Sequence, residues 1–264
     1  MRKVFISLLL LWGVSLGASA QNTKDIMKDP IPVAMFQVTY AFHIPAMDTK
    51  ETYKVSNTIG GSFVYKTASN WLLTANGNFI FGKVKGDRID IMGEGITTGH
   101  GEITGGSGSY VALSINQRGL FFQGEVGKLF PFGPNPNSGF FVQAGLGYLR
   151  NRIRIDFQQE TYNTPYQVYD DYAYGYDRMR GGPALHLETG YLYLSDNRIT
   201  NFSVSLEVTY ARTKDLRDYD FRVFNGVPVG YTDPAKRYND LYFGIRLGWN
   251  IPTYQRQPEA FYYN

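Results

Sequence analysis

The sequence predicts an all-β protein, an eight-stranded antiparallel up-and-down transmembrane β-barrel. Three observations support this fold class: stretches in which apolar and polar residues alternate, connections that are alternately short and long, and a surplus of aromatic residues. Of 264 residues, 43% are hydrophobic, 16% aromatic and only 19% charged, which is too apolar for intrinsic disorder. We therefore expect most of the chain to be folded, with much of its apolar surface either buried or in lipid.

The N-terminus has the pattern of a secretory signal. Arg2 and Lys3 precede an apolar run over residues 4–16, and Ala18-Ser19-Ala20 supplies the small residues that a signal peptidase requires. The apolar run is shorter than the roughly 20 residues that span a bilayer as a helix. The expected organisation is a signal peptide at 1–20, a periplasmic segment at 21–32, a barrel at 33–252 and a periplasmic tail at 253–264.

Eight stretches show the period-two alternation of a strand with one apolar face. The clearest places Phe202, Val204, Leu206, Val208 and Tyr210 on one side and Ser203, Ser205, Glu207 and Thr209 on the other. The others lie near 34–42, 59–66, 71–81, 118–131, 139–156, 178–194 and 240–249.

The connections between these stretches alternate in length. Short, turn-rich links are expected at about 68–70, 132–138 and 195–200, and long ones at about 45–57, 83–117, 157–177 and 222–239. Four long outer loops and three short periplasmic turns, with both termini in the periplasm, are typical of an integral barrel of the cell outer membrane. A soluble sandwich has no reason to sort its connections in this way.

The apolar faces are expected to point outward, with aromatic rings at the membrane interfaces. A lipocalin-like soluble barrel is the alternative, and it would turn the apolar faces inward. The opposite faces carry many polar groups, which suits a lumen that is hydrated or ion-paired. The residues predicted to neutralise one another inside the barrel are Lys66, Glu125, His186, Glu188, Glu207 and Arg246, with Glu207 as the nearest partner of Arg246.

Three segments are distinctive: Gly127-Lys128-Leu129-Phe130-Pro131, Gly175-Tyr176-Asp177-Arg178-Met179-Arg180-Gly181-Gly182 and the tail Phe261-Tyr262-Tyr263. Together with the leader and the eight-strand rhythm, they resemble small outer-membrane β-barrel proteins of the Bacteroidota. The resemblance covers the mature chain and implies an accessory barrel, as found in type IX secretion and barrel-assembly machines. The tail departs from the common pattern, because residues continue beyond Ile251, and the assembly signal is expected around Leu247 to Ile251.

Enzymatic chemistry is not expected. Lipid A-modifying barrels need a histidine with a serine and an acidic partner, and only His43, His100 and His186 are available, none with that spacing. The glycine-rich loop at 86–109 lacks a phosphate-binding pattern, and no cofactor is predicted. No metal site is predicted: the chain has no cysteine, and Asp170, Asp171 and Asp177 indicate a calcium site only weakly, because their spacing is not that of a known loop.

Two surface features could bind partners. Arg150, Arg152 and Arg154 share one side of the fifth strand above its apolar band, where guanidinium groups could contact lipopolysaccharide phosphates. The third long loop carries tyrosines suited to an interface, although they could equally pack the loops on one another. These tyrosines are Tyr162, Tyr166, Tyr169, Tyr172 and Tyr174.

The sequence therefore predicts a structural or accessory subunit that presents its loops to a partner or docks to an envelope complex. Its expected partners are outer-membrane lipid, lipopolysaccharide and envelope proteins. The net charge of +3 gives no sign of nucleic-acid binding. A narrow channel and, less favoured, a lipid A-modifying enzyme are the alternatives.

Overall fold

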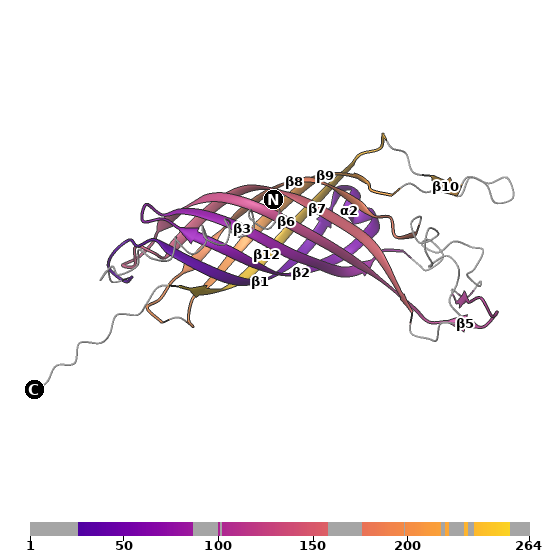
Figure 1. Ribbon diagram of the computed structural model, residues 1–264, viewed down its shortest axis with the longest axis horizontal. Coiled ribbons are helices and arrows are strands. Elements are labelled where there is room, and N and C mark those ends of the chain that lie inside the picture. Colours follow the sequence, from indigo (N-terminus) through magenta and orange to yellow (C-terminus); the bar gives the residue numbers. More distant parts are fainter. Residues whose placement is uncertain are drawn as a thin grey trace, which may run out of the picture.

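The structure is a computed structural model that describes residues 26–86, 100, 102–157, 176–197, 199–217, 220–221, 230–231 and 235–253. Eight long strands form one closed antiparallel barrel in the order β1-β12-β9-β8-β7-β6-β3-β2 (Figure 1). The predicted fold class is confirmed. The strands are β1 (Val33–Ala46), β2 (Tyr53–Lys66), β3 (Trp71–Val84), β6 (Leu113–Pro131), β7 (Gly139–Phe157), β8 (Arg180–Tyr193), β9 (Phe202–Asp215) and β12 (Tyr238–Pro252).

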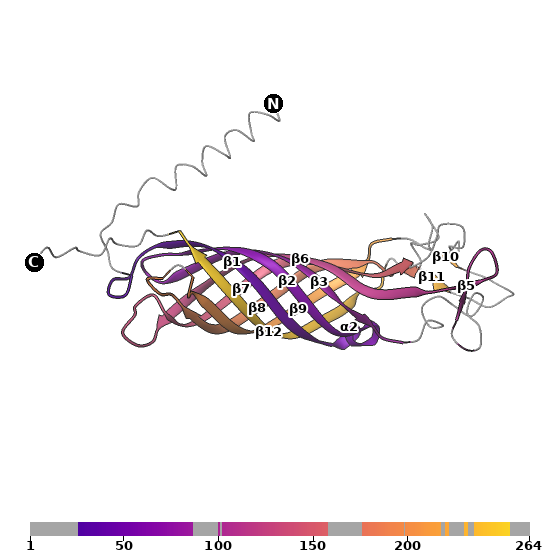
Figure 2. The same cartoon turned by 90° about the horizontal axis from the view of Figure 1, so that it is seen from below.

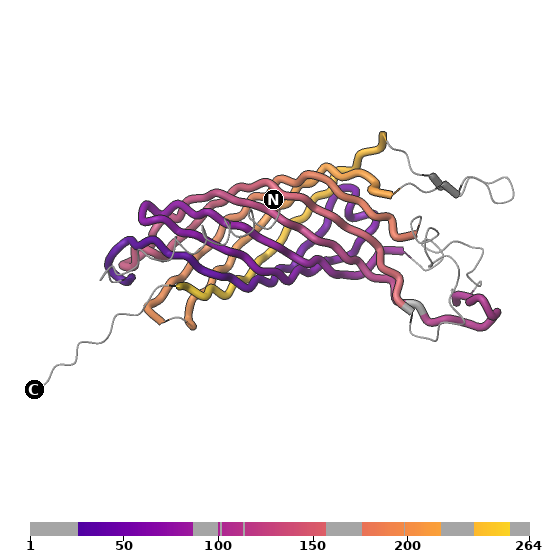
Figure 3. Tube along the Cα trace, viewed as in Figure 1, coloured from indigo at the N-terminus to yellow at the C-terminus, as the bar shows by residue number. Residues whose placement is uncertain are grey.

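The first and last strands close the barrel. β1 pairs with β12 from Met35 opposite Pro252 to Ala46 opposite Leu241, and the chain can be followed around the wall from indigo to yellow in Figure 3. Closure pairs the outer edge of the first strand with that of the last strand. This pairing is required in a membrane because lipid offers no hydrogen-bond partner to an unpaired backbone.

The two ends of the barrel differ. At one end, the turn end, residues 67–70, 132–138 and 194–201 connect the strands. Asn70 (φ 63°) and Gly133 (φ 95°) adopt the left-handed conformation that suits tight turns. At the other end, the loop end, the chain continues into two small hairpins, β4 (Ile103–Thr104) with β5 (Tyr110–Val111) and β10 (Asp220–Phe221) with β11 (Gly230–Tyr231), as Figure 2 shows.

The connection expected at 45–57 is much shorter than predicted. β1 continues to Ala46 and β2 begins at Tyr53, so only the six-residue helix α2 (Met47–Thr52) joins them. The strands extend beyond the predicted alternation because their hydrogen-bonded ladders continue, to Ala46 opposite Leu241 on β12 and to Tyr53 opposite Val84 on β3. Among the described residues, no helix is long and apolar enough to cross a membrane.

The apolar faces point outward, as predicted, and the lipocalin-like alternative is wrong. On β9, Val204 and Leu206 are 44% and 59% exposed, whereas Ser205 and Glu207 are each 2% exposed. The same alternation runs along β1 and β12, where Phe36, Val38, Ile245 and Leu247 are all exposed. An apolar exterior around a polar interior is the arrangement of a transmembrane β-barrel.

Aromatic side chains ring the turn end on the outer surface. Trp71 is 47% exposed beneath the Lys128 ammonium, which lies 5.0 Å from the ring centroid. Trp249 is 48% exposed and donates a hydrogen bond of 2.8 Å from Nε1 to the carbonyl of Ile199. Tyr65 is also exposed at this end, and such rings with a polar edge suit the interfacial region of a membrane.

Candidate functional site: a filled lumen

The turn end of the lumen is closed by the segment that precedes β1. Ile26 and Ile31 pack with Met35, Leu72, Leu129 and other buried residues in one apolar cluster. Asn137, which is fully buried in the turn between β6 and β7, holds this segment: its Nδ2 donates to the carbonyls of Ile26 and Asp29, both at 2.7 Å. Residues 26–32 therefore form a plug in the turn end.

Lys66 belongs to this plug and not to an ion pair. Its side chain is fully buried, and Nζ donates to Asn137 Oδ1 at 2.7 Å and to the carbonyl of Ile31 at 3.1 Å. Within the described residues, no carboxylate forms a salt bridge with it, so the predicted neutralisation of Lys66 by a lumen acid is not found. The charge is solvated by amide and carbonyl oxygens, which are partners that strand alternation does not reveal.

The middle of the lumen holds a buried ionic cluster, and the structure brings five of the six predicted residues into it. Arg246 Nε donates to Glu207 Oε2 at 2.5 Å, with both residues no more than 3% exposed. The two lie diagonally on neighbouring strands, since Glu207 is opposite Gly244 and Arg246 is opposite Ser205. A buried charge is tolerated when it is paired and hydrogen-bonded, and here it is both.

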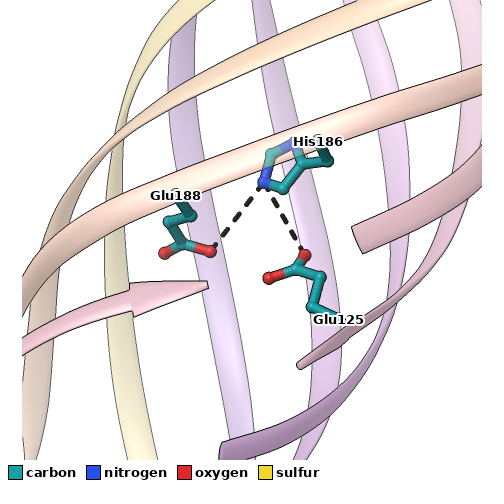
Figure 4. Close-up of side chains that lie close together, drawn as sticks. All are labelled: Glu125, His186 and Glu188. Atoms are coloured by element: carbon teal, nitrogen blue, oxygen red, sulfur yellow. Dashed lines mark ion pairs between the residues drawn. The ribbon is translucent and has the colours of Figure 1, made fainter. Parts of the chain in front are cut away.

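His186 lies among three carboxylates. Its Nε2 is 3.6 Å from Glu125 Oε1, 3.9 Å from Glu188 Oε2 and 3.7 Å from Glu207 Oε2. Figure 4 shows the ring nitrogen directed between Glu125 and Glu188. The other ring nitrogen, Nδ1, forms a hydrogen bond of 2.8 Å with the hydroxyl of Thr209, directly opposite on β9.

Neutral side chains form hydrogen bonds with two acids of the cluster, Glu125 and Glu188. Asn76 Nδ2 donates to Glu125 Oε1 at 2.6 Å, and Gln123 donates to the same oxygen. Ser205 Oγ donates to Glu188 Oε1 at 2.5 Å. These contacts fix one oxygen of each carboxylate, whereas Glu125 Oε2 has no hydrogen-bond partner within the described part of the chain.

His43 is a further member of the cluster that the sequence pattern did not indicate. It was considered only as a possible catalytic residue near the first loop, yet it is 7% exposed and hydrogen-bonded to Glu207. His43 is opposite Gly244, which in turn is opposite Glu207, and a Cβ on that glycine would lie 2.4 Å from the imidazole. The glycine lets the side chains of β1 and β9 meet across β12.

The same arrangement recurs on the other side of the lumen. Glu125 is opposite Gly145, and Gly145 is opposite His186, so a glycine again separates an acid from a histidine. A Cβ there would lie 2.5 Å from Glu125 Cγ. In both cases an inward-facing glycine lies between two inward-facing ionisable residues on the flanking strands. Once the strand register is known, such a glycine indicates that the two side chains can meet.

Polar side chains also fill the lumen toward the loop end. Tyr242 is 3% exposed, and its hydroxyl accepts a hydrogen bond of 2.8 Å from Asn151 Nδ2. Ser56 donates to Gln117 at 2.5 Å, and Thr213 donates to Asp240 at 2.6 Å. The barrel interior is therefore crossed by buried side chains at the turn end, in the middle and toward the loop end.

Little free volume remains beside the ionic cluster. One cavity, lined by His43, Glu207 and Arg246 among others, holds about 10 Å³, and a second, next to Glu188, holds about 20 Å³. Each is the size of one water molecule. Neither cavity is large enough to admit an organic substrate.

The three predicted lipid-contacting arginines lie on the outer surface toward the loop end. Arg150 and Arg154 are exposed and Arg152 is half-buried. Arg152 is opposite Arg118 of β6, whose guanidinium lies 5.8 Å from the ring centroid of Phe79. Arg154 forms an ion pair of 2.6 Å with Asp156. The three arginines follow the exposed residues Leu146 and Tyr148 along the outer face of β7, in the direction of the loop end.

Two other predicted features are only partly described. The tyrosines at 162–174 lie outside the described residues, as do Asp170 and Asp171. Asp177, the third acid considered for calcium, accepts a hydrogen bond of 3.1 Å from the backbone N–H of Met179. It also forms an ion pair of 2.6 Å with Arg217. Burial raises the pKa of the Asp177 carboxyl, and Arg217 counteracts part of that rise.

Comparisons with known proteins give architectural likenesses only. No protein-family model matches the sequence, and no curated protein matches it. Among solved structures, the outer membrane protein OprG from Pseudomonas aeruginosa is 14% identical, with a TM-score of 0.40 over 86% of this chain and 99% of that one. Ail, the attachment invasion locus protein of Yersinia pestis, is 10% identical (TM-score 0.38; 83% and 99% covered). Neisserial surface protein A is 11% identical (TM-score 0.36; 81% and 95% covered). The fold assignment rests on the closed strand register and not on these likenesses.

Proposed function

We propose that this chain is an integral outer-membrane barrel that serves as a structural or accessory subunit and acts through its outer surface and loop end. In this proposal the turn end faces the periplasm and the loop end faces outward. The partner is an envelope protein or complex, such as a secretion or barrel-assembly machine. The Bacteroidota resemblance stays a prediction within this proposal.

The observation that carries the proposal is the filled lumen. Side chains of Lys66, Arg246 and Tyr242 cross the interior at three levels, and each is buried and hydrogen-bonded. A narrow channel needs a continuous path for water or ions, and a lipid-modifying enzyme needs a histidine–nucleophile pair open to the lipid. His43 and His186 are both engaged inside the barrel, and of the three histidines only His100 is exposed. The outer surface and the loop end are the parts left to meet a partner.

The basic residues outside the barrel support the outward orientation. On three adjacent strands, the cations lie at the loop-end margin of the apolar band, and guanidinium matches phosphate with two parallel hydrogen bonds. In the proposed orientation they meet the lipopolysaccharide phosphates. They are Lys83, Arg118, Arg150, Arg152 and Arg154.

A lipid-retention assay tests this contact. The barrel is purified in mild detergent, and co-purifying lipopolysaccharide is measured per chain by its hydroxylated fatty acids. Replacing Arg150, Arg152 and Arg154 together with glutamine should lower the retained amount, whereas Lys128→Gln, a turn-end control, should not. Equal losses in both variants would contradict the proposed lipid contact and orientation.

Site-specific photocrosslinking in native membranes tests the accessory role. A photoreactive residue replaces Tyr110, which is 62% exposed on β5 at the loop end, or Leu146, which is 69% exposed on the lipid-facing wall of β7. We expect a discrete protein adduct from position 110 and only lipid adducts from position 146. If neither position 110 nor other loop-end positions gave a protein adduct, the accessory role would be wrong.

A further inference from the structure

The side chains of Glu125, His186 and Glu188 form a compact set of metal-ligand types in the middle of the lumen. One oxygen or nitrogen from each lies within 4.8 Å of the other two, and the three residues are 3%, 1% and 7% exposed. We propose that these three residues bind one divalent transition-metal ion of the zinc class. The proposal is independent of the accessory role, since it concerns the interior of the barrel.

The first support is an unpartnered nitrogen. His186 Nε2 has no hydrogen-bond partner within the described residues, although the ring is almost wholly buried. The Thr209 hydroxyl at 2.8 Å can accept the Nδ1 proton, and this leaves the Nε2 lone pair facing the carboxylates. Metal-binding histidines are commonly oriented by such a bond from their other nitrogen. A metal cation between this lone pair and the two carboxylates would bind to all three groups.

The second support is the spacing of the candidate ligands. The distances of 3.6 Å to Glu125 and 3.9 Å to Glu188 are too long for direct hydrogen bonds. Two ligands of a tetrahedral zinc ion, each about 2.0–2.2 Å from the metal, lie about 3.3–3.6 Å from each other. The two histidine–carboxylate separations reach or slightly exceed that range, and the carboxylate oxygens lie within 4.8 Å of each other, so the two carboxylates must move together to complete the site.

The third support is the charge balance of the cluster. Glu207 is neutralised by Arg246 through the 2.5 Å bond. When ionised, Glu125 and Glu188 add two negative charges, and Glu188 is directly opposite Glu207 on the neighbouring strand, where like charges destabilise a sheet. One dication between Glu125 and Glu188 balances these charges with both histidines neutral.

The ligand chemistry selects the class of ion. One imidazole and two carboxylates suit zinc and its first-row neighbours, whereas calcium and magnesium prefer oxygen ligands throughout. Ser205 holds Glu188 Oε1 and leaves Oε2 toward the ring, whereas Asn76 holds Glu125 Oε1, the oxygen 3.6 Å from His186 Nε2. Both contacts would orient the carboxylates as outer-sphere partners do in known metal sites. The ion would link β6 to β8 over Gly145 of the intervening strand β7.

Zinc binding by the refolded full chain tests the proposal. The barrel is refolded into detergent with zinc chloride, so that entry into a closed lumen is not limiting, and bound zinc is measured by elemental mass spectrometry after gel filtration. We expect one zinc per barrel. His186→Gln, and Glu125→Gln combined with Glu188→Gln, should each weaken binding about tenfold or more. Glu51→Gln, the same change at an exposed position of α2, should bind as the wild type does.

Heat-modifiable migration on gels establishes that each variant is folded. Should the lumen variants fail to fold, X-ray absorption at the zinc edge of the wild-type barrel decides, with one imidazole nitrogen and carboxylate oxygens expected around the ion. A wild-type barrel that retains no zinc would overturn the proposal. So would folded lumen variants that bind as the Glu51→Gln control does, or a spectrum without imidazole.

Discussion

Arg246 donates a 2.5 Å hydrogen bond to Glu207 across the β12–β9 pair, in a part of the lumen where both side chains are almost wholly buried. Glu207 also accepts a hydrogen bond from His43, so it joins residues from three consecutive strands of the wall. Because a buried charge without a partner is costly, this contact links the stability of the barrel to the pairing of its interior.

A double-mutant cycle measures that link. Arg246→Met should lower the free energy of unfolding in detergent by on the order of 3–5 kcal/mol, because it leaves the Glu207 carboxylate uncompensated. Adding Glu207→Gln should recover part of the loss, since a neutral amide can stay hydrogen-bonded to His43. Urea titrations of the wild type, both single variants and the double variant provide the four values. Strictly additive losses would mean that the two residues are not coupled.

The facing of β9 predicts a depth-dependent cost for arginine. Leu206→Arg, on the lipid-facing side in the middle of the strand, should destabilise the barrel by about 2–4 kcal/mol, whereas near the interface the cost falls to about 0–1 kcal/mol. Tyr210→Arg, on the same face nearer the loop end, is the matched comparison, because the chain already carries the exposed Arg212 just beyond it. Equal unfolding free energies for the two variants in lipid vesicles would contradict the placement of the apolar band.

The turn-end plug should depend on a single asparagine. Asn137→Ala removes the hydrogen bonds to Ile26, Asp29, Ile31 and Lys66, and it should increase amide hydrogen exchange at Ile31, whose N–H donates to Asn137 at 3.1 Å. Ser69→Ala, in the exposed neighbouring turn, is the control and should leave that exchange unchanged. If Ile31 stays equally protected in both variants, the apolar contacts alone hold the plug.

Closure of the barrel should be visible on a gel. A closed hydrogen-bonded barrel resists unfolding by detergent until it is heated, so boiled and unboiled samples should migrate differently. The comparison needs only purified protein in detergent. Identical migration of the two samples would be inconsistent with the β1–β12 pairing that closes the sheet.

The sequence was sufficient for the barrel because lipid on one face and a polar lumen on the other impose a strict alternation. It was less informative where the alternation ends: β2 begins at Tyr53 in the structure, although its predicted apolar pattern starts near residue 59. Beyond the apolar band, backbone pairing continues without any need for apolar outward residues, so the strand has no sequence mark there.

Partners within the lumen were harder to predict than the direction of each side chain. The alternation indicated that Lys66 points inward, but its partner Asn137 is in a turn and its other acceptors are backbone carbonyls. His43 has the same inward parity as Thr39 and Ala41, yet its contact with Glu207 depends on Gly244 and on the register of two strand pairs. Register between strands is a property of the folded barrel and is not encoded in the period of one strand.

Single-channel recording is the sharpest test of the filled lumen, on which the proposed action through the outer surface depends. The purified full chain is inserted into planar lipid bilayers, and current is recorded under a range of applied voltages, with Arg246→Met as a variant that disturbs the filling. We expect no stable conductance from the wild type. Discrete, reproducible open levels from the wild-type barrel would contradict the filled lumen and favour the channel alternative.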